Sequence, residues 1–208
     1  MKNLIIIRHP LVQRDVTLLR DKRTPSNQFR AILRRMSTLM AFEVTRELPL
    51  RSTTVTTPLA KTKGSVLARP VVLVPILRAG LGLVGGFVEV LPDARVGHIG
   101  LYRDEETLKP VDYYFKVPRN IREALVFLLD PMLATGGSAS AAITYLKKRG
   151  ANTLVCVTLV AAPEGVRKVL HEHPDVRIYT CALDEKLNSK GYIVPGLGDA
   201  GDRIFGTE

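Results

Sequence analysis

The chain has 208 residues, of which 46% are hydrophobic and 24% are charged. These are the proportions of an ordinary globular protein, so a disordered or fibrous chain is excluded. The net charge is +10, and all of the excess lies in residues 1–69, which hold 14 basic and four acidic side chains, whereas residues 70–208 hold 16 of each. A basic third favours an anionic partner such as a polyphosphate, a nucleic acid or a membrane surface, without choosing among them.

The cysteines and the N-terminus predict a reduced, cytoplasmic protein. Cys156 and Cys181 lie in apolar, strand-like runs, which is typical of buried free thiols. The apolar run at 4–7 is too short for the core of a signal peptide. No apolar run approaches the ~20 residues that span a bilayer, so we expect no membrane partner.

Helical spacing dominates the first third of the chain. From Ser26, interpreted as an N-cap, apolar residues recur at helical spacing as far as Leu48. The arginines between positions 20 and 35 are interpreted as a solvated face. The Thr- and Pro-rich run at 52–58 and the following 61–64 predict a connection with an edge strand.

From residue 71 onward, short apolar strands alternate with helices. Strands are predicted at 71–75, 95–102, 111–117, 125–129, 153–160 and 176–183, and helices at 81–91, 139–149 and 164–173. This alternation predicts an α/β fold, a mainly parallel sheet flanked by helices, with ligands beyond the carboxyl ends of the strands. Segment 103–114, charged and then aromatic, is predicted to form a β-hairpin arm. Segment 191–205 has four glycines and one proline and no helical or alternating pattern, which indicates an ordered, functional loop.

The segment from Asp130 to Ser138 joins the strand LVFLL to a helix. The stretch from Thr135 to Ser138 combines hydroxyl groups with two glycines at a helix N-terminus, which is the arrangement that holds a phosphate monoester. Asp130, at the end of the strand, would accept hydrogen bonds from sugar hydroxyls. The alternative is an ordinary glycine turn with a serine cap.

Two further segments could carry chemistry. Arg78 lies in the strand–loop–helix junction VPILRAG, where its guanidinium would clamp a diphosphate. The adjoining GLGLVG at 80–85 has the spacing of a dinucleotide-binding fingerprint, but four residues separate the strand from its first glycine, so we discount a dehydrogenase. The Gly- and Pro-rich segment 191–202 would present backbone N–H and C=O groups to a flat heterocycle. An Ω-loop that closes the C-terminus is an equal alternative.

Together these segments resemble the uracil phosphoribosyltransferase family over almost the whole chain. The matching stretches are HPLV, VPILRAGLG, LYRDEETLKPV, DPMLATGGS, LVAAPEG, HPDVRIYT and GYIVPGLGDAGDRIFGT. The resemblance implies a homodimer or homotetramer that transfers ribose 5-phosphate from 5-phosphoribosyl 1-diphosphate (PRPP) to N1 of uracil, giving UMP and pyrophosphate, with Mg²⁺ as cofactor and a GTP effector as a further ligand. It also implies a single phosphoribosyltransferase domain with a helical part at 1–70, a PRPP-binding core at 71–190 and a base-binding loop at 191–208.

The resemblance carries over to individual positions. It implies that the PRPP loop consists of Asp130, Pro131, Met132, Leu133, Ala134, Thr135, Gly136, Gly137 and Ser138. It implies that Arg78 and Arg103 bind the diphosphate, that Ile193 and the backbone of Gly198, Asp199 and Ala200 read uracil, and that Asp199 faces PRPP or its metal. Asp130, Asp199, Arg78 and Arg103 would be the catalytic residues. Pro131 stands where many such loops have a second acid, so Mg²⁺ is expected to be held through PRPP.

The basic N-terminal third supports one hypothesis of a different class, a PRPP- or nucleotide-sensing regulator that binds RNA. Against it, a basic run is usually a solvated face, and the sequence has no aromatic platform for stacking bases. We therefore expect small-molecule substrates and no nucleic acid. His171-Glu172-His173 is interpreted as a solvated helix end rather than a metal site.

Overall fold

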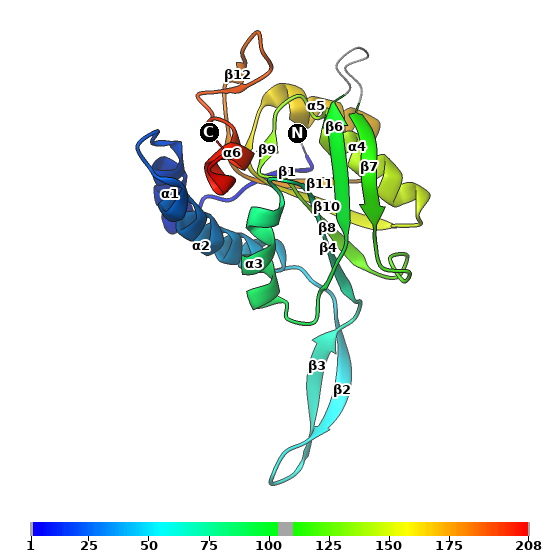
Figure 1. Cartoon of the computed structure of the whole chain (residues 1–208). Helices are drawn as coiled ribbons and strands as arrows, with labels where there is room; N and C mark the ends of the chain where they lie inside the picture. The colour runs from blue at the N-terminus through cyan, green and yellow to red at the C-terminus, as the bar shows by residue number, and fades with distance from the viewer. Residues whose placement is uncertain (1, 104–109, 208) are drawn as a thin grey trace.

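The computed structural model describes residues 2–103 and 110–207, without the side chains of 102–103 and 110–112. A mainly parallel sheet lies at its centre (Figure 1). Its strands run in the order β1 (Leu4–Ile6), β11 (Arg177–Leu183), β10 (Thr153–Ala161), β8 (Leu125–Leu129), β4 (Val71–Leu77), β6 (His98–Arg103) and β7 (Pro110–Lys116), with β5 (Arg95–Val96) on β4 and β9 (Met132–Leu133) on β10. The pairing of β6 with β7 is antiparallel and the other pairings in this sheet are parallel, which confirms the predicted α/β fold.

Helices cover both faces of the sheet. The first face carries α1 (Pro10–Arg20), α2 (Ser26–Val44) and α3 (Leu81–Val90), and the second carries α4 (Gly137–Lys148) and α5 (Pro163–Glu172). Successive side chains of β4 alternate between the two faces. Leu73 packs into the apolar cluster on the first face, whereas Val72 and Val74 pack into the cluster on the second face. A strand covered on both sides must be apolar at every position, which is why these strands read as continuous apolar runs.

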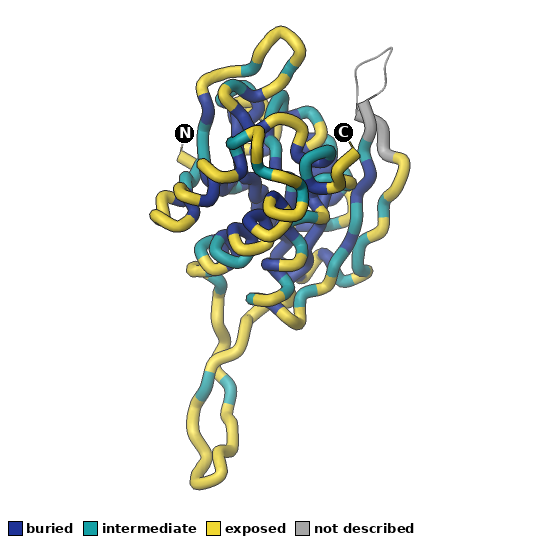
Figure 2. The backbone as a smooth tube through the Cα atoms, turned by 60° about the vertical axis from the view of Figure 1, so that its left-hand side comes forward, coloured by how far each residue is buried: buried dark blue, intermediate teal, exposed yellow. Residues whose placement is uncertain are grey.

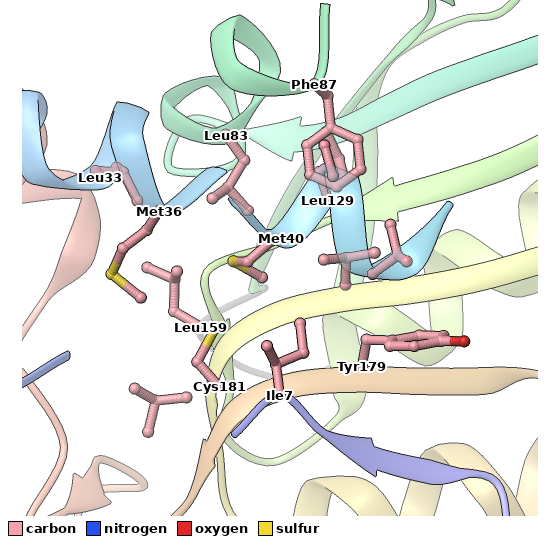
Figure 3. Packing of buried hydrophobic residues seen from close by; sticks show 14 of the residues in the cluster. Ile7, Leu33, Met36, Met40, Leu83, Phe87, Leu129, Leu159, Tyr179 and Cys181 are labelled. Carbon is pink, nitrogen blue, oxygen red and sulfur yellow. The ribbon is translucent and has the colours of Figure 1, made fainter. Parts of the chain in front are cut away.

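The first cluster joins the two ends of the chain. In Figure 3, Met40 of α2 and Phe87 of α3 lie over the strand residues, with Leu129 among them. Ile193 and Leu197, from the C-terminal segment, belong to the same buried cluster. The C-terminal segment is therefore built onto the core that the N-terminal helices form.

A long hairpin leaves the body of the molecule between α2 and β4. Strands β2 (Leu50–Thr56) and β3 (Lys61–Leu67) pair in antiparallel register and project away from the sheet (Figure 1), with most of their residues exposed (Figure 2). The prediction of a connection with an edge strand was wrong here. The β-branched residues favour extended backbone even without a core to bury, and the Thr57 hydroxyl closes the turn by accepting the N–H groups of Leu59 and Ala60.

The predicted arm at 103–114 is confirmed as an antiparallel pairing of β6 with β7, and its residues 104–109 lie outside the described part of the chain. Strand β1 was not predicted, because three apolar residues give no readable period. The N-cap position of α2 is occupied by Pro25 rather than Ser26, and no side chain caps this helix.

The C-terminal segment contains regular structure that the sequence did not predict. Strand β13 (Ile193–Val194) pairs with β12 (Lys186–Leu187), and helix α6 (Ala200–Phe205) follows. Asp199 is the N-cap of α6, and its carboxylate accepts the N–H of Asp202 at 3.0 Å. A helix of six residues is too short to show an apolar period in the sequence, so the capping residue is the feature that could have indicated it.

The end of α5 also differs from the prediction of a solvated helix end. His173 is buried, and its Nε2 lies 2.9 Å from the hydroxyl oxygen of Ser140 on α4. Cys156 and Cys181 are buried and free, as expected. Within residues 2–103 and 110–207, no helix is long and apolar enough to cross a membrane.

Candidate functional site

A crevice opens at the carboxyl ends of β4 and β8, where parallel α/β sheets bind their ligands. It consists of two adjoining cavities of about 520 and 240 Å³. Both cavities are lined by Ala79, Asp130, Ser138, Asp199 and Gly201. The three segments that the sequence singled out, around Arg78, Asp130 and Asp199, therefore meet at one place.

A larger cavity of about 700 Å³ lies at the root of the β2–β3 hairpin. Its lining includes Val71, the first residue of β4, and Arg95, the first residue of β5. It therefore opens at the amino ends of these strands and contains none of the three segments.

The segment after β8 is fastened to its neighbour β10 by the backbone. The carbonyl of Pro131 accepts the N–H groups of Leu159 and Val160, each at 3.1 Å, and the carbonyl of Leu133 accepts that of Ala162 at 2.9 Å. The side chain of Leu133 lies in the core beneath. Of the predicted PRPP loop, the residues that line the crevice are Asp130, Met132, Ala134, Thr135 and Ser138, while Pro131 and Gly136 are buried.

Gly136 occupies the N-cap position of α4 in the left-handed region, with φ of +79°. A Cβ at this position would lie 2.7 Å from the carbonyl oxygen of Gly165, so both the conformation and the space require glycine. The N–H of Gly137 is 3.4 Å from the hydroxyl oxygen of Thr135. The arrangement sets hydroxyl groups and the N-terminal amides of a 12-residue helix at the crevice, where an anion is stabilised.

Asp130 stands between the two cavities and is half-buried. Burial raises the pKa of its carboxyl group from 3.8 to about 7, and the N–H of Met132, 3.4 Å from Oδ1, offsets part of this rise. The carboxyl group therefore titrates near neutral pH, in contact with both cavities.

Arg78 lies at the smaller cavity. Its Nη2 donates to Asp202 Oδ1 at 3.2 Å, and its guanidinium lies 5.8 Å from the ring centroid of Phe205. The side chain remains 57% exposed, so the cation is open to a ligand. The Leu77–Arg78 peptide is cis. Arg103 ends β6, and its side chain lies outside the described part of the structure.

The C-terminal segment lines the 520 Å³ cavity of the crevice. Ile193 and Ala200 line this cavity, yet both are buried in the core cluster, so their polar contribution comes from the main chain. Gly198 has φ of +81°. Backbone donors and acceptors at fixed positions would suit a flat heterocycle.

The crevice has further lining residues to which the sequence assigned no individual role. Lys190 lies outside the segments that the sequence singled out, whereas Ala79, Gly191, Tyr192 and Gly201 lie within them. A Cβ built on Gly191 would lie 3.7 Å from Thr135 Cγ2, and one on Gly201 would lie 3.8 Å from Arg78 Nη2. These close approaches join the C-terminal segment to the other two, and they depend on the tertiary fold rather than on any local pattern.

The GLGLVG stretch begins at the N-cap of α3 and continues inside that helix. A Cβ on Gly82 would lie 2.5 Å from Leu33 Cδ2 on α2. At this position glycine serves the packing of two helices, which supports the decision to discount a dinucleotide fingerprint.

The donor groups of the crevice suit Mg²⁺ together with a polyphosphate. Two carboxylates, those of Asp130 and Asp199, line the crevice. The described side chains include no group of three or more His, Cys, Asp or Glu that could hold a metal ion. Mg²⁺ typically keeps several waters and binds through one or two carboxylates and the phosphates of a substrate.

Comparison with known proteins agrees with this geometry. The family model for uracil phosphoribosyltransferase matches residues 6–207. Proteins named uracil phosphoribosyltransferase from Finegoldia magna and Pediococcus pentosaceus are 56% and 57% identical, the first over the full length of both chains and the second over 98% of each.

Solved structures give the same result for the fold. A protein from Aquifex aeolicus superposes with a TM-score of 0.93 at 35% identity, covering 99% of each chain. A hypoxanthine phosphoribosyltransferase from Trypanosoma cruzi, 15% identical, superposes with a TM-score of 0.53 over 76% of this chain and 75% of its own, which shows the shared phosphoribosyltransferase fold. The chain belongs to the uracil phosphoribosyltransferase family.

Proposed function

We propose that the protein transfers ribose 5-phosphate from PRPP to N1 of uracil, giving UMP and pyrophosphate. One observation carries the proposal: a helix N-terminus suited to a phosphate and a backbone-lined pocket suited to a base share one crevice, with Asp130 between them. The family match over 6–207 supports the same reaction.

In this proposal PRPP lies across the Asp130–Ser138 segment. Thr135 to Ser138 hold the 5-phosphate with hydroxyl and amide donors, and Asp130 accepts the ribose hydroxyls. Arg78 binds the diphosphate, and Arg103 at the end of β6 approaches it from the arm. The carbonyls of Pro131 and Leu133 are already paired with backbone N–H groups at and just after β10, so these two residues hold the loop in place. The other residues of the loop offer N–H donors and side chains to the ligand.

Uracil is read by the backbone of Ile193, Gly198, Asp199 and Ala200. Uracil presents an N3–H donor beside a C4 carbonyl, and cytosine reverses both. A rigid backbone that donates to O4 and accepts from N3–H leaves buried groups unpaired against cytosine, and such mismatches permit discrimination of about 10⁴.

The chemistry is a displacement at C1 of the ribose. The bond from C1 to pyrophosphate breaks as positive charge develops on the ring, the bond from C1 to N1 of uracil forms, and the N1 proton passes to solvent or to the departing pyrophosphate. Arg78, Arg103 and the helix amides stabilise the charge of the leaving group. Asp130 and Asp199 would lie near a Mg²⁺ ion held chiefly through PRPP, and the ion would further neutralise the charge of the diphosphate. Asp199 acts electrostatically, since one of its carboxylate oxygens already caps α6.

The whole chain forms one catalytic unit in this proposal, with residues 1–70, 71–190 and 191–208 contributing support, PRPP binding and base binding. A buried cluster that includes residues of all three parts supports a single domain. The exposed β2–β3 hairpin, with Leu59 97% exposed at its tip, supports a homodimer or homotetramer, because an arm that buries no core is stabilised by a second copy. The free cysteines support a cytoplasmic location.

A GTP effector rests on the family resemblance alone. Its test is the rate of UMP formation with and without GTP at subsaturating PRPP, where activation would lower the KM for PRPP and an unchanged rate would remove the effector from the proposal.

Product analysis tests the proposed function. Purified protein, PRPP and Mg²⁺ are incubated with uracil, cytosine, orotate or hypoxanthine, and nucleotides are separated by chromatography. UMP and pyrophosphate from uracil alone are expected. A nucleotide from another base would overturn the assignment of the base pocket, and no product from a folded protein that binds PRPP would favour the regulator.

A further inference from the structure

The turn at Gly196 and Leu197 in the base-binding segment is fastened by charged side chains from both ends of the chain. Arg20, in the last turn of α1, donates from Nη1 and Nη2 to Asp184 at 2.8 and 2.5 Å. The same Nη1 donates to the carbonyl oxygen of Gly196 at 2.7 Å, and the N–H of Gly196 donates to Asp184 Oδ2 at 2.8 Å. One ion pair therefore satisfies both polar backbone groups of a single residue in the base loop. Arg20 is not part of a solvated face, contrary to the prediction.

A second arginine makes the reciprocal connection. Arg203 of α6 donates from Nη1 to the carbonyl oxygens of Leu197, at 2.8 Å, and of Leu19, and from Nη2 to that of Asp21 at 2.7 Å. Carbonyls at the end of a helix lack partners within the helix, so the end of α1 is a natural acceptor. Figure 1 shows α1 and α6, the blue and red ends of the chain, side by side.

The two fastened residues occupy a tight turn. Gly196 has φ of +59°, and a Cβ there would lie 2.2 Å from the carbonyl oxygen of Ile193. Gly196 and Leu197 thus separate the two backbone stretches that line the crevice, Ile193 on one side and Gly198 to Ala200 on the other. A displacement of the turn would move both stretches relative to the PRPP loop.

We propose that Arg20, Asp184 and Arg203 form a latch, a set of positioning residues that hold the base loop in the conformation that selects uracil. This inference rests on the proposed function, since it names what maintains the geometry of that base pocket. None of the three residues lines the crevice, so they act through the backbone of Gly196 and Leu197.

Rigidity at this turn is what selection by hydrogen bonds requires. A loop that shifts freely would offer a donor to one base and an acceptor to another, and the penalty against cytosine would be lost. A misplacement of about 1 Å by a distant substitution costs about 10²-fold in rate in other enzymes, so a partly loosened latch should have a measurable effect.

The latch is tested with Arg20→Met, which keeps much of the side-chain volume but removes the donors to Asp184 and Gly196. The matched control is Arg34→Met, because Arg34 is an exposed arginine of the same region whose partner is Glu89 on α3. Arg20→Lys keeps the charge without the paired geometry and should restore part of the effect.

Steady-state kinetics should separate the two substrates. For Arg20→Met we expect the KM for uracil to rise about tenfold and the preference for uracil over cytosine to fall by about as much, with the KM for PRPP unchanged. Arg34→Met should behave like the wild type. A folded Arg20→Met protein with wild-type KM for uracil and wild-type base preference would overturn the latch.

Hydrogen exchange gives a readout that does not depend on activity. Amides of residues 193–201 should exchange faster in Arg20→Met than in the wild type and in Arg34→Met, while those of the Asp130–Ser138 segment should not. If the wild type forms no UMP, the proposed function fails. Hydrogen exchange then tests the latch by itself, because unchanged exchange of residues 193–201 in Arg20→Met would overturn it. If the wild type forms UMP, unchanged kinetics and exchange in Arg20→Met would overturn the latch alone.

Discussion

The PRPP loop and the base loop line the same crevice, but different forces hold them in place. The loop from Asp130 to Ser138 is fixed by the strand before it, the helix after it and backbone hydrogen bonds to β10, with no side chain needed to hold its carbonyls. The base loop is fixed by Arg20, more than 170 positions away, and by Asp184 and Arg203. A local phosphate site can therefore be recognised from a short motif, whereas the geometry of the base site is a property of the whole fold.

The largest effect is expected at the PRPP loop, from Asp130→Asn. The substitution keeps the shape of the side chain and removes the carboxylate, so kcat/KM for PRPP should fall by about 10²–10³-fold. Steady-state rates of UMP formation measure this fall. Wild-type kinetics in the variant would contradict the role of the Asp130 carboxylate in binding PRPP.

The same variant should be more stable than the wild type in alkaline solution. Burial raises the folded pKa of Asp130 to about 7 from 3.8, so the unfolded chain ionises first as the pH rises. The resulting loss of stability begins above pH 4 and is complete above pH 7, where it reaches up to about 4 kcal/mol. In urea unfolding at pH 8, the free energy of unfolding of Asp130→Asn should exceed that of the wild type. At pH 4 the two proteins should have the same free energy of unfolding.

The next largest effect concerns the diphosphate. Arg78→Met removes an exposed cation at the smaller cavity, and kcat/KM for PRPP should fall by about 10²-fold. Arg34→Met, another exposed arginine with an acidic partner, is the control and should leave the rate unchanged. Equal rates in the two variants would contradict the assignment of Arg78.

Asp199, in the base loop, has two roles, as a carboxylate that lines the crevice and as the cap of α6. Asn is as good an N-cap as Asp, so Asp199→Asn removes only the charge, while Asp199→Ala removes both and should cost about 1 kcal/mol of stability. We expect turnover to fall about tenfold in both variants. If turnover is normal in Asp199→Asn and falls only in Asp199→Ala, the carboxylate charge has no role in catalysis and Asp199 serves only as the cap of α6.

The smallest effect is expected from Ile193→Val. The side chain is buried in the core, and the proposal has uracil contact the backbone of this residue, so stability should fall by about 1 kcal/mol while the KM for uracil stays the same. Thermal unfolding and steady-state kinetics measure the two quantities. A rise in the KM for uracil would mean that the side chain itself contacts the base.

The sequence predicted the sheet, the flanking helices and the meeting of three segments, because apolar runs and glycine–hydroxyl loops are local signals. It did not predict the β2–β3 hairpin, whose strands bury no face, or helix α6, which is only six residues long. The role of Arg20 was also missed, since a paired and an unpaired arginine look alike in sequence. What was missed depends on contacts between distant segments.

A crystal structure of the complex with UMP would show whether the phosphate and the base occupy the two halves of one crevice. We expect the 5′-phosphate to bind the amides and hydroxyls of Thr135 to Ser138, and O4 and N3–H of uracil to bind the backbone of Gly198 to Ala200. UMP bound in another place, such as the 700 Å³ cavity at the root of the β2–β3 hairpin, would contradict it.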